Sequence, residues 1–265
     1  MKSPLLIAAS LVCATLLPSC LQHETTINLK TNGSGTLVEE TRFGAQMVAM
    51  LSQMPAGETG KDPFAEMFSE EKAKARTAKL GDGVTFEKIE KIDANGAKGV
   101  RIIYKFADIN KLQISPGSGM SDLNPEAQPA GQPKPQPIRF KLEGDDLTVE
   151  MPKPQKSDKP ADAKPKDPDA DNPQAEAMAK QMMSDMKVSL KIVAVDGIDE
   201  TNATHRDGAT VTLMEMDMGK ILNQPGAFKK LQNADDEDPA ATMAVLKGID
   251  GMKFETKEKI VIDLK

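Results

Sequence analysis

Cysteine, histidine and methionine are the residue types in this chain that could support chemistry. The 265 residues include two cysteines (Cys13 and Cys20), two histidines (His23 and His205) and 16 methionines. These numbers leave few groups for a metal centre or a nucleophilic site, and the sequence contains no nucleophile elbow, phosphate-binding glycine loop or zinc motif. We therefore expect no catalytic residues and no cofactor.

Cys20 follows a segment that is typical of protein export. Lys2 supplies a positive charge, and residues 5–17 (LLIAASLVCATLL) form an apolar run. As a helix this run would be about 20 Å long, which is short of the ~30 Å hydrocarbon core of a bilayer. The pattern favours a secretory signal over a membrane-spanning helix.

At Leu17, Ser19 and Cys20 the sequence resembles the lipobox of bacterial lipoproteins, which are processed by signal peptidase II. The resemblance implies that residues 1–19 form the signal peptide and that Leu17 and Ser19 are recognised at the cleavage site. It also implies that Cys20 carries a diacylglyceryl group and an acylated amino terminus. Cleavage would remove Cys13, so lipidation would use the last thiol and no disulfide could form.

The acyl chains on Cys20 are expected to be the contact with the membrane. The formal net charge of −6 opposes binding to anionic lipid headgroups. The negative charge and the low content of aromatic residues, 3 %, also argue against binding to nucleic acid. Residues 20–24, including His23, are expected to form a lipidated tether. No aspartate follows Cys20, which favours the outer membrane over the inner one if the organism has both.

The remaining sequence alternates strand pairs, joined by turn signals such as Asn32-Gly33, with helical stretches. The expected strands cover residues 25–30, 36–43, 84–92, 99–106, 138–142, 147–151, 188–195, 209–216 and 259–264. The expected helices cover residues 45–54, 64–80, 175–186, 220–232 and 239–246. This order predicts an α+β fold with a mostly antiparallel sheet and packed helices. With Gly33-Ser34-Gly35 and residues 99–112, it also faintly resembles the soluble domain of LppM-type actinobacterial lipoproteins.

Two stretches with six prolines each, residues 115–137 and 152–173, predict disorder. They define a low-complexity insertion over residues 114–174, with a short hairpin inside it. The insertion separates an α+β lobe at residues 25–113 from a second one at residues 175–265. Each lobe has few large apolar residues, so we expect the two lobes to share one core.

Met214, Met216 and Met218 form an M-x-M-x-M pattern, which on a strand would place three thioethers on one face. Further methionines cluster at residues 182–186 on the preceding expected helix. Thioethers are soft ligands suited to Cu(I) or Ag(I). The alternative is core packing, because methionine is a flexible filler in a chain with few aromatic rings.

These observations favour a lipid-anchored cell-envelope protein with a non-enzymatic binding or structural role toward an envelope lipid, polymer or protein. The first alternative is a periplasmic protein that binds a soft metal through the methionines. The second is an enzyme that uses carboxylates, since such sites leave no signature in residue spacing. A large apolar pocket in the structure would favour lipid binding. Clustered thioethers would favour metal binding, and two carboxylates that converge in a cleft would favour catalysis.

Overall fold

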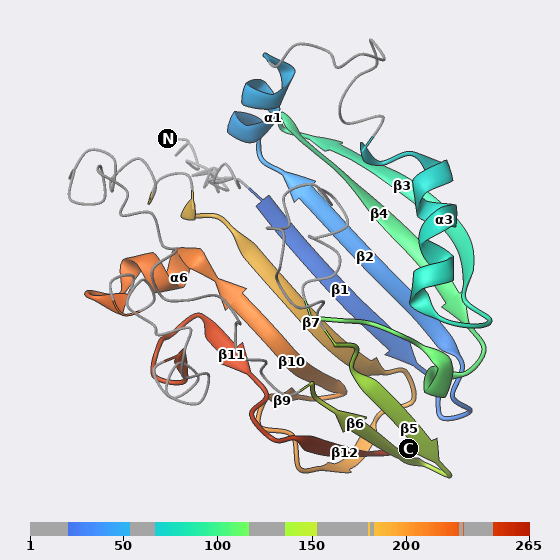
Figure 1. Cartoon of the computed structure of the whole chain (residues 1–265). Coiled ribbons are helices and arrows are strands. Elements are labelled where there is room, and N and C mark those ends of the chain that lie inside the picture. Colours follow the sequence, from blue (N-terminus) through green and yellow to red (C-terminus); the bar gives the residue numbers. More distant parts are fainter. Residues whose placement is uncertain are drawn as a thin grey trace, which may run out of the picture.

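The computed structural model describes residues 21–53, 67–116, 136–152, 183–227 and 246–265, together with Lys180 and Lys230. Strands are the main regular structure and make up about half of the described chain (Figure 1). The strands are β1 (Leu21–Leu29), β2 (Gly35–Phe43), β3 (Thr85–Ala94), β4 (Ala97–Phe106), β5 (Arg139–Glu143), β6 (Asp146–Glu150), β7 (Lys187–Ala194), β8 (Ile198–Thr201), β9 (Arg206–Asp207), β10 (Thr210–Asp217), β11 (Met252–Phe254) and β12 (Lys259–Leu264). The helical elements are α1 (Ala45–Ser52), α3 (Glu70–Leu80), the 3-10 turn η1 (Ile109–Lys111) and α6 (Met218–Asn223).

The larger sheet is mixed. Its strands follow the order β11-β10-β7-β1-β2-β4-β3, and β9 pairs with β10. All neighbours are antiparallel except β1 and β7, which run parallel from Gln22 opposite Lys187 to Leu29 opposite Ala194. This parallel pair brings together Glu24 and Ser189, which are 165 positions apart and hydrogen-bonded. Segments from the two expected lobes therefore lie in one sheet.

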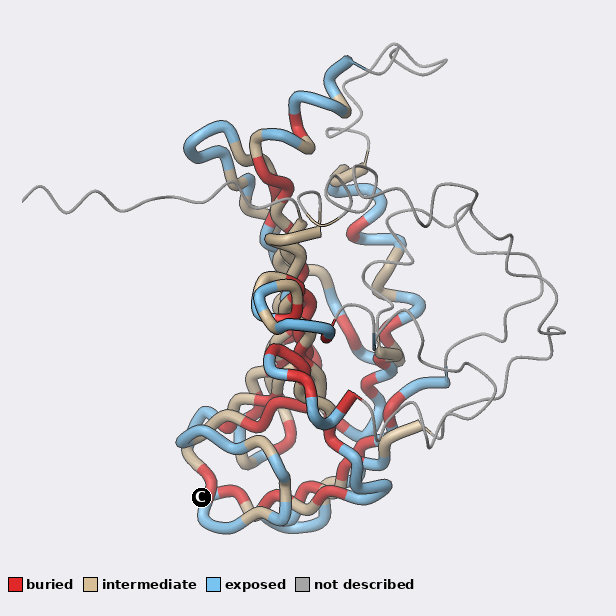
Figure 2. Tube along the Cα trace, turned by 90° about the vertical axis from the view of Figure 1, so that its left-hand side faces the viewer, coloured by how far each residue is buried: buried red, intermediate tan, exposed pale blue. Residues whose placement is uncertain are grey.

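The smaller sheet has the order β5-β6-β12-β8 and is antiparallel throughout. It packs against one face of the larger sheet, which we call the inner face. The main core lies between the two sheets, and Figure 2 shows the buried trace in red where they meet near the C-terminal end. Its side chains with no more than 1 % exposure include Ile27, Leu29, Leu37, Ile138, Leu147, Ile192, Leu213, Ile260 and Ile262.

The expected α+β fold with helices packed on the sheet is wrong, because the protein is mostly β. The expected strands at residues 138–142, 147–151 and 259–264 form the second sheet, and this sheet covers the core. Helix α3 is charged over most of its length and buries only Ala73 and Leu80. A helix with so little apolar surface cannot seal a sheet face.

The expected helix at residues 64–80 is described only from residue 67 onward. Its regular part is α3, which begins after Ser69, whose hydroxyl accepts a hydrogen bond from the Lys72 amide at 3.3 Å. The expected helix at residues 220–232 corresponds in its first part to α6. Most of the expected helices at residues 175–186 and 239–246 lies outside the described residues.

Most residues of the two proline-rich stretches also lie outside the described part of the chain. The disorder predicted for them therefore stays a prediction. The hairpin predicted inside the insertion is present as β5 and β6. Its side chains Phe140, Leu147 and Val149 belong to the main core. Among the described residues, no helix has the length and the apolar character needed to cross a membrane.

Candidate functional site

The residues predicted around the cleavage site, Leu17, Ser19 and Cys20, lie outside the described part of the chain. The described part begins at Leu21, which is already the first residue of β1 and pairs with Phe43 at the end of β2. Residues 21–24, which were expected to be part of a tether, are therefore strand. Cys20 is bonded directly to the first residue of the larger sheet.

The three methionines of the M-x-M-x-M pattern do not form one group. Met214 packs against the main core, whereas Met216 and Met218 belong to a second apolar cluster. Met218 opens α6 and is not part of the strand. The second cluster contains five methionines, which are Met183, Met186, Met216, Met218 and Met252.

His23, which was expected in an unstructured tether, is buried on the inner face of β1 with an exposed fraction of 4 %. It lies in a row of polar residues where apolar side chains would be expected. We call this group the inner polar cluster. Its members are His23 and Thr25 on β1, Glu39 and Thr41 on β2, Tyr104 on β4, and Arg76 on α3.

Strand pairing places His23 opposite Thr41, and Thr25 opposite Glu39. The Nδ1 atom of His23 is hydrogen-bonded to the Thr41 hydroxyl at 2.9 Å, and its Nε2 atom lies 3.3 Å from the Thr25 hydroxyl. Burial lowers the pKa of His23, and the positive charge of Arg76 adds to this while Glu39 opposes it. The imidazole is therefore neutral near pH 7, with both ring nitrogens engaged.

Glu39 is held by Arg76 through two hydrogen bonds. Arg76 donates from Nε to Oε2 at 2.9 Å and from Nη2 to Oε1 at 2.7 Å. The side chains of the pair are 11 % and 6 % exposed for Arg76 and Glu39, respectively. This fork-like arrangement is the strong geometry for an arginine and a carboxylate. It fastens α3 to the inner face and leaves the interior of the cluster close to neutral.

The hydroxyl of Tyr104 is buried and has no hydrogen-bond partner in the structure. Its ring packs edge-on against Phe86, with the centroids 6.3 Å apart. Burial raises the pKa of Tyr104 well above its ordinary value, and the nearby charge of Glu39 raises it further. The group is therefore a neutral hydroxyl that can both donate and accept a hydrogen bond.

A cavity of about 240 Å³ lies between α3 and the inner face. Its polar wall includes His23, Glu39, Thr41, Arg76 and Tyr104 of the inner polar cluster. The remaining lining residues are Met67, Phe68, Ser69, Lys72, Ala73, Ala75, Lys79 and Ile102. The interior thus combines apolar walls with a few converging polar groups, which is the usual composition of a ligand site.

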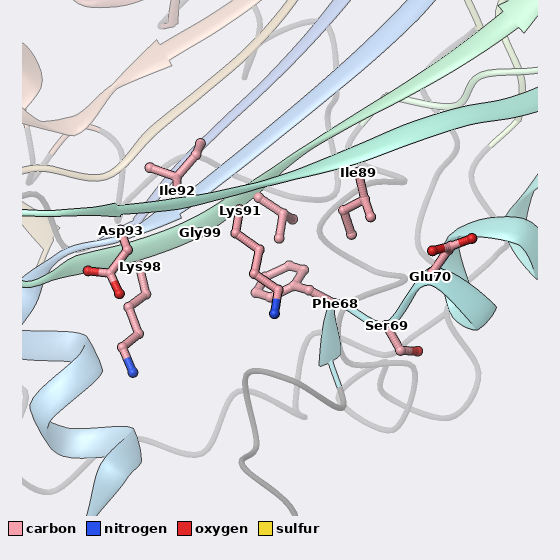
Figure 3. A pocket seen from close by; sticks show the side chains of 10 residues that line it. Phe68, Ser69, Glu70, Ile89, Lys91, Ile92, Asp93, Lys98 and Gly99 are labelled. Carbon is pink, nitrogen blue, oxygen red and sulfur yellow. The ribbon is translucent and has the colours of Figure 1, made fainter.

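A second cavity of about 420 Å³ shares Phe68 and Ser69 with the first. It lies along β3 and β4, and Figure 3 shows the Lys91 side chain extending toward the Phe68 ring while Ile92 points to the other side of the strand. Glu70, Asp93 and Lys98 also line it. Its charged residues Glu70, Lys91 and Asp93 are exposed, whereas Glu39 and Arg76 in the cavity beneath α3 are largely buried.

Within the described residues, no three His, Cys, Asp or Glu side chains gather closely enough to hold a metal ion. The second histidine, His205, is half-buried just before β9 and lines neither cavity. Among the described residues that line the cavity beneath α3, Glu39 is the only carboxylate, and Arg76 binds both of its oxygens.

Sequence reasoning missed the inner polar cluster because β1 was expected to begin at Thr25, which left His23 outside the sheet. An available signal was the period of two in His23, Thr25, Ile27 and Leu29, which places these side chains on one face. On the same face of β2 lie Leu37, Glu39, Thr41 and Phe43. When polar residues continue a row of buried apolar residues along a strand, they indicate a buried polar cluster that another element of the fold covers.

A comparison with solved structures finds similarity to the folded domain of the LppM protein of Mycobacterium tuberculosis. The match covers 76 % of this chain and 85 % of that chain, at 12 % sequence identity and a TM-score of 0.31. LppM gives its name to the lipoprotein type that the sequence faintly resembles. A TM-score this low does not establish a common fold. No protein-family model and no curated protein matches the sequence.

Proposed function

We propose that this chain is a lipid-anchored protein of the bacterial cell envelope that binds a small, partly apolar ligand in the cavity beneath α3. The lipobox residues Leu17, Ser19 and Cys20 support the anchor. The absence of an aspartate after Cys20 favours the outer membrane where two membranes exist. The cavity and the inner polar cluster support the binding role.

The observation that carries the binding role is the buried Tyr104 hydroxyl without a partner. Leaving a buried polar group unpaired costs about 1–3 kcal/mol, and the large majority of buried side-chain polar atoms in folded proteins have a partner. In the described residues the only other buried side-chain polar atom without a partner is Nε of Arg42. A ligand carrying a hydroxyl, carbonyl or N–H group would complete the site at Tyr104.

The same cluster favours binding over catalysis. A general base needs a free acceptor atom that faces the reacting group. Both oxygens of Glu39 are held by Arg76, and both ring nitrogens of His23 are engaged by threonines. We therefore propose a role in which the ligand is held and released unchanged.

The lining indicates the chemistry of the ligand. Inside, the charges of Glu39 and Arg76 compensate each other and His23 is neutral, so the buried end of the ligand is neutral. Ala73 and Ile102 offer apolar contact. The exposed residues Lys72 and Lys79 also line the cavity and could face an anionic group at its mouth. The matching ligand class is a small amphiphile.

The binding role can be tested with anilinonaphthalene sulfonate, an amphiphilic fluorescent probe with an N–H group and a sulfonate. We expect the probe to bind to the protein and its affinity to fall about tenfold in Tyr104→Phe, because one buried hydrogen bond is worth about 1.4 kcal/mol at most. Lys74→Ala, on the exposed side of α3, should leave the affinity unchanged. Equal affinity in wild type, Tyr104→Phe and the cavity-filling variant Ala73→Leu would contradict the proposal.

The anchor is tested separately by incorporation of labelled palmitate. We expect the label in the wild-type protein and none in Cys20→Ser, because the cysteine sulfur is the attachment point of the diacylglyceryl group. A wild-type protein that stays unlabelled and leaves the membrane fraction in aqueous buffer would contradict the anchor while leaving the ligand site open to its own test.

One observation supports a second candidate function, binding of Cu(I) or Ag(I). Five thioethers gather in the second apolar cluster, and thioethers prefer these soft ions. Stoichiometric Ag(I) should raise the thermal midpoint of the protein, and Met216→Leu should remove the increase. An unchanged midpoint in the wild type would end this candidate and leave core packing as the role of the methionines.

A further inference from the structure

At one end of the larger sheet, a helix and the turn beside it contain no charged residue. Helix α1 has the sequence AQMVAMLS, with no acidic or basic residue, and buries only Val48. Met50 is 46 % exposed. Residues 94–97 (Ala-Asn-Gly-Ala), at the turn between β3 and β4, lie beside α1, since a Cβ atom on Gly96 would be 3.0 Å from that of Ala45. We call α1 and residues 94–97 the uncharged tip.

The uncharged tip is at the end of the larger sheet where β1 begins. Leu21 pairs with Phe43, and only Gly44 separates Phe43 from α1 (Figure 1). Leu21, Phe43 and Val48 belong to one small apolar cluster. Consecutive Cα atoms are about 3.8 Å apart, so Cys20 lies within one residue of this end of the sheet.

We infer that the uncharged tip inserts into the surface of the bilayer that holds the acyl chains of Cys20, with Met50 entering the apolar layer. This inference rests on the proposed lipidation of Cys20. Because β1 starts directly after the anchor, no linker separates the folded body from the headgroups. Apolar side chains of interfacial helices reach about 5–10 Å into the boundary between headgroups and acyl chains.

The charge distribution supports a contact of this kind. The chain has a formal net charge of −6, so an anionic membrane surface does not attract it as a whole. The uncharged tip itself presents neither sign to the lipid, and Asp93 and Lys98, which flank it on β3 and β4, have opposite charges. Its contact with the lipid should therefore depend little on salt. The described residues contain only one other exposed large apolar side chain besides Met50, which is Val195 at the opposite end of β7.

Insertion would also bring the cavity beneath α3 close to the lipid. Met67 and Phe68 pack against the apolar cluster of Phe43 and Val48, and the same two residues line that cavity. An amphiphile leaving the bilayer would then have a short path to Tyr104.

The experiment uses the full-length lipidated protein in phosphatidylcholine vesicles. If Cys20 is acylated and Cys13 removed, the mature chain has no free thiol, so Met50→Cys introduces a single site for an environment-sensitive maleimide fluorophore. Val195→Cys is the matched control, because that side chain is 53 % exposed and lies a strand length of about 25–30 Å from the start of β1. Nitroxide groups on the lipid acyl chains serve as quenchers.

We expect blue-shifted emission at position 50 and a loss of about half or more of its intensity to the nitroxide lipids, with no change at position 195. The inference is overturned if position 50 reports water while the protein still floats with the vesicles. Wild-type protein without an added cysteine separates the two proposals. If it reacts with the maleimide at Cys20, as peptide mapping of the labelled protein would show, Cys20 is free and the anchor itself fails.

Discussion

The inner face of the larger sheet has two halves that share the same strands and differ in chemistry. Toward the smaller sheet, β1 and β2 present Ile27, Leu29 and Leu37, each with 0 % exposure. Toward the start of β1, the same face presents the polar residues His23, Thr25, Glu39 and Thr41, which are all buried. The apolar half is closed by a second sheet, whereas the polar half is covered by α3.

The two halves differ in how closely the side chains of the inner face are packed. Two apolar sheet faces interlock and leave no space between them. Helix α3 offers Ala73 and Leu80 and is fastened by the Arg76–Glu39 pair, so a cavity remains beneath it. The proposed binding site therefore lies where the inner face is less closely packed.

The largest effect should come from the apolar half. Ile27 lies between Leu37 and Ile192 on the neighbouring strands. Ile27→Ala removes buried methyl groups and leaves a cavity, so we expect the free energy of unfolding to fall by about 2–5 kcal/mol in urea titrations. Thr25→Ala, two residues earlier on the same face, should cost about 1 kcal/mol, since it removes one long hydrogen bond. Equal costs for both variants would remove the distinction between the halves.

In the polar half, the ion pair between α3 and β2 should give the next largest effect. Arg76→Met leaves the Glu39 carboxylate buried without its partner, which destabilises a protein strongly. Because Arg76 is 11 % exposed and water can reach the pair, we expect a loss of about 2–3 kcal/mol, somewhat below the ~3–5 kcal/mol for fully buried pairs.

Two comparisons control this prediction. Combining Arg76→Met with Glu39→Leu should recover most of the loss, because the unpaired charge is gone. Lys74→Met on the same helix breaks a pair with Glu70 whose side chains are more than half exposed, and should change the stability by less than about 1 kcal/mol. A double variant no more stable than Arg76→Met alone would mean that the pair does not act as a unit.

A smaller effect is expected from the pH dependence of His23. Burial lowers its pKa below the ordinary 6.5, so the unfolded chain binds a proton in a pH range where the folded protein does not. Stability attributable to His23 is therefore complete above pH 6.5 and declines as the pH falls toward the lowered pKa, by up to about 1.4 kcal/mol per pH unit. His23→Gln should reduce this slope at pH values below 6.5 when unfolding is followed in denaturant. The same slope in both proteins would place the proton uptake elsewhere.

The sequence predicted the local pairs of strands well and their assembly poorly. The hairpins β1–β2, β3–β4 and β5–β6 are confirmed, because a turn such as Asn95-Gly96, with positive φ at both residues, encodes its position locally. The parallel contact between β1 and β7 joins distant segments and has no local signal. The second sheet has none either, since its strands come from three separate parts of the chain.

The candidate site could be anticipated only in part. His23 was assigned to a tether since strand boundaries are the least certain feature of a sequence pattern. The strand expected at residues 209–216 ends before Met218, and Met218 opens α6, so the three thioethers do not align along one strand. The Arg76–Glu39 pair links residues 37 positions apart and depends on how α3 crosses β2, which no spacing rule determines.

The smallest expected effect, and the only gain, concerns Tyr104. Its hydroxyl is buried without a partner, so Tyr104→Phe removes the desolvation cost and keeps the ring against Phe86. Without added ligand we expect the free energy of unfolding to rise by about 0.5–1 kcal/mol, measured as a higher urea midpoint at unchanged slope. Tyr104→Leu loses the ring contact and should be less stable than the wild type.

The sign of the Tyr104→Phe change decides between two accounts of the polar half. If the cavity exists to receive a ligand, the free protein is less stable than it could be, and the phenylalanine variant gains stability while it loses affinity for the amphiphilic probe. Added probe should then stabilise the wild type more than the variant, because binding to the folded state raises its stability by RT ln(1 + c/Kd) at a free probe concentration c, a quantity that is larger when the probe binds more tightly. A variant less stable than the wild type without probe would mean that a water molecule already satisfies the hydroxyl, and the polar half would be structural.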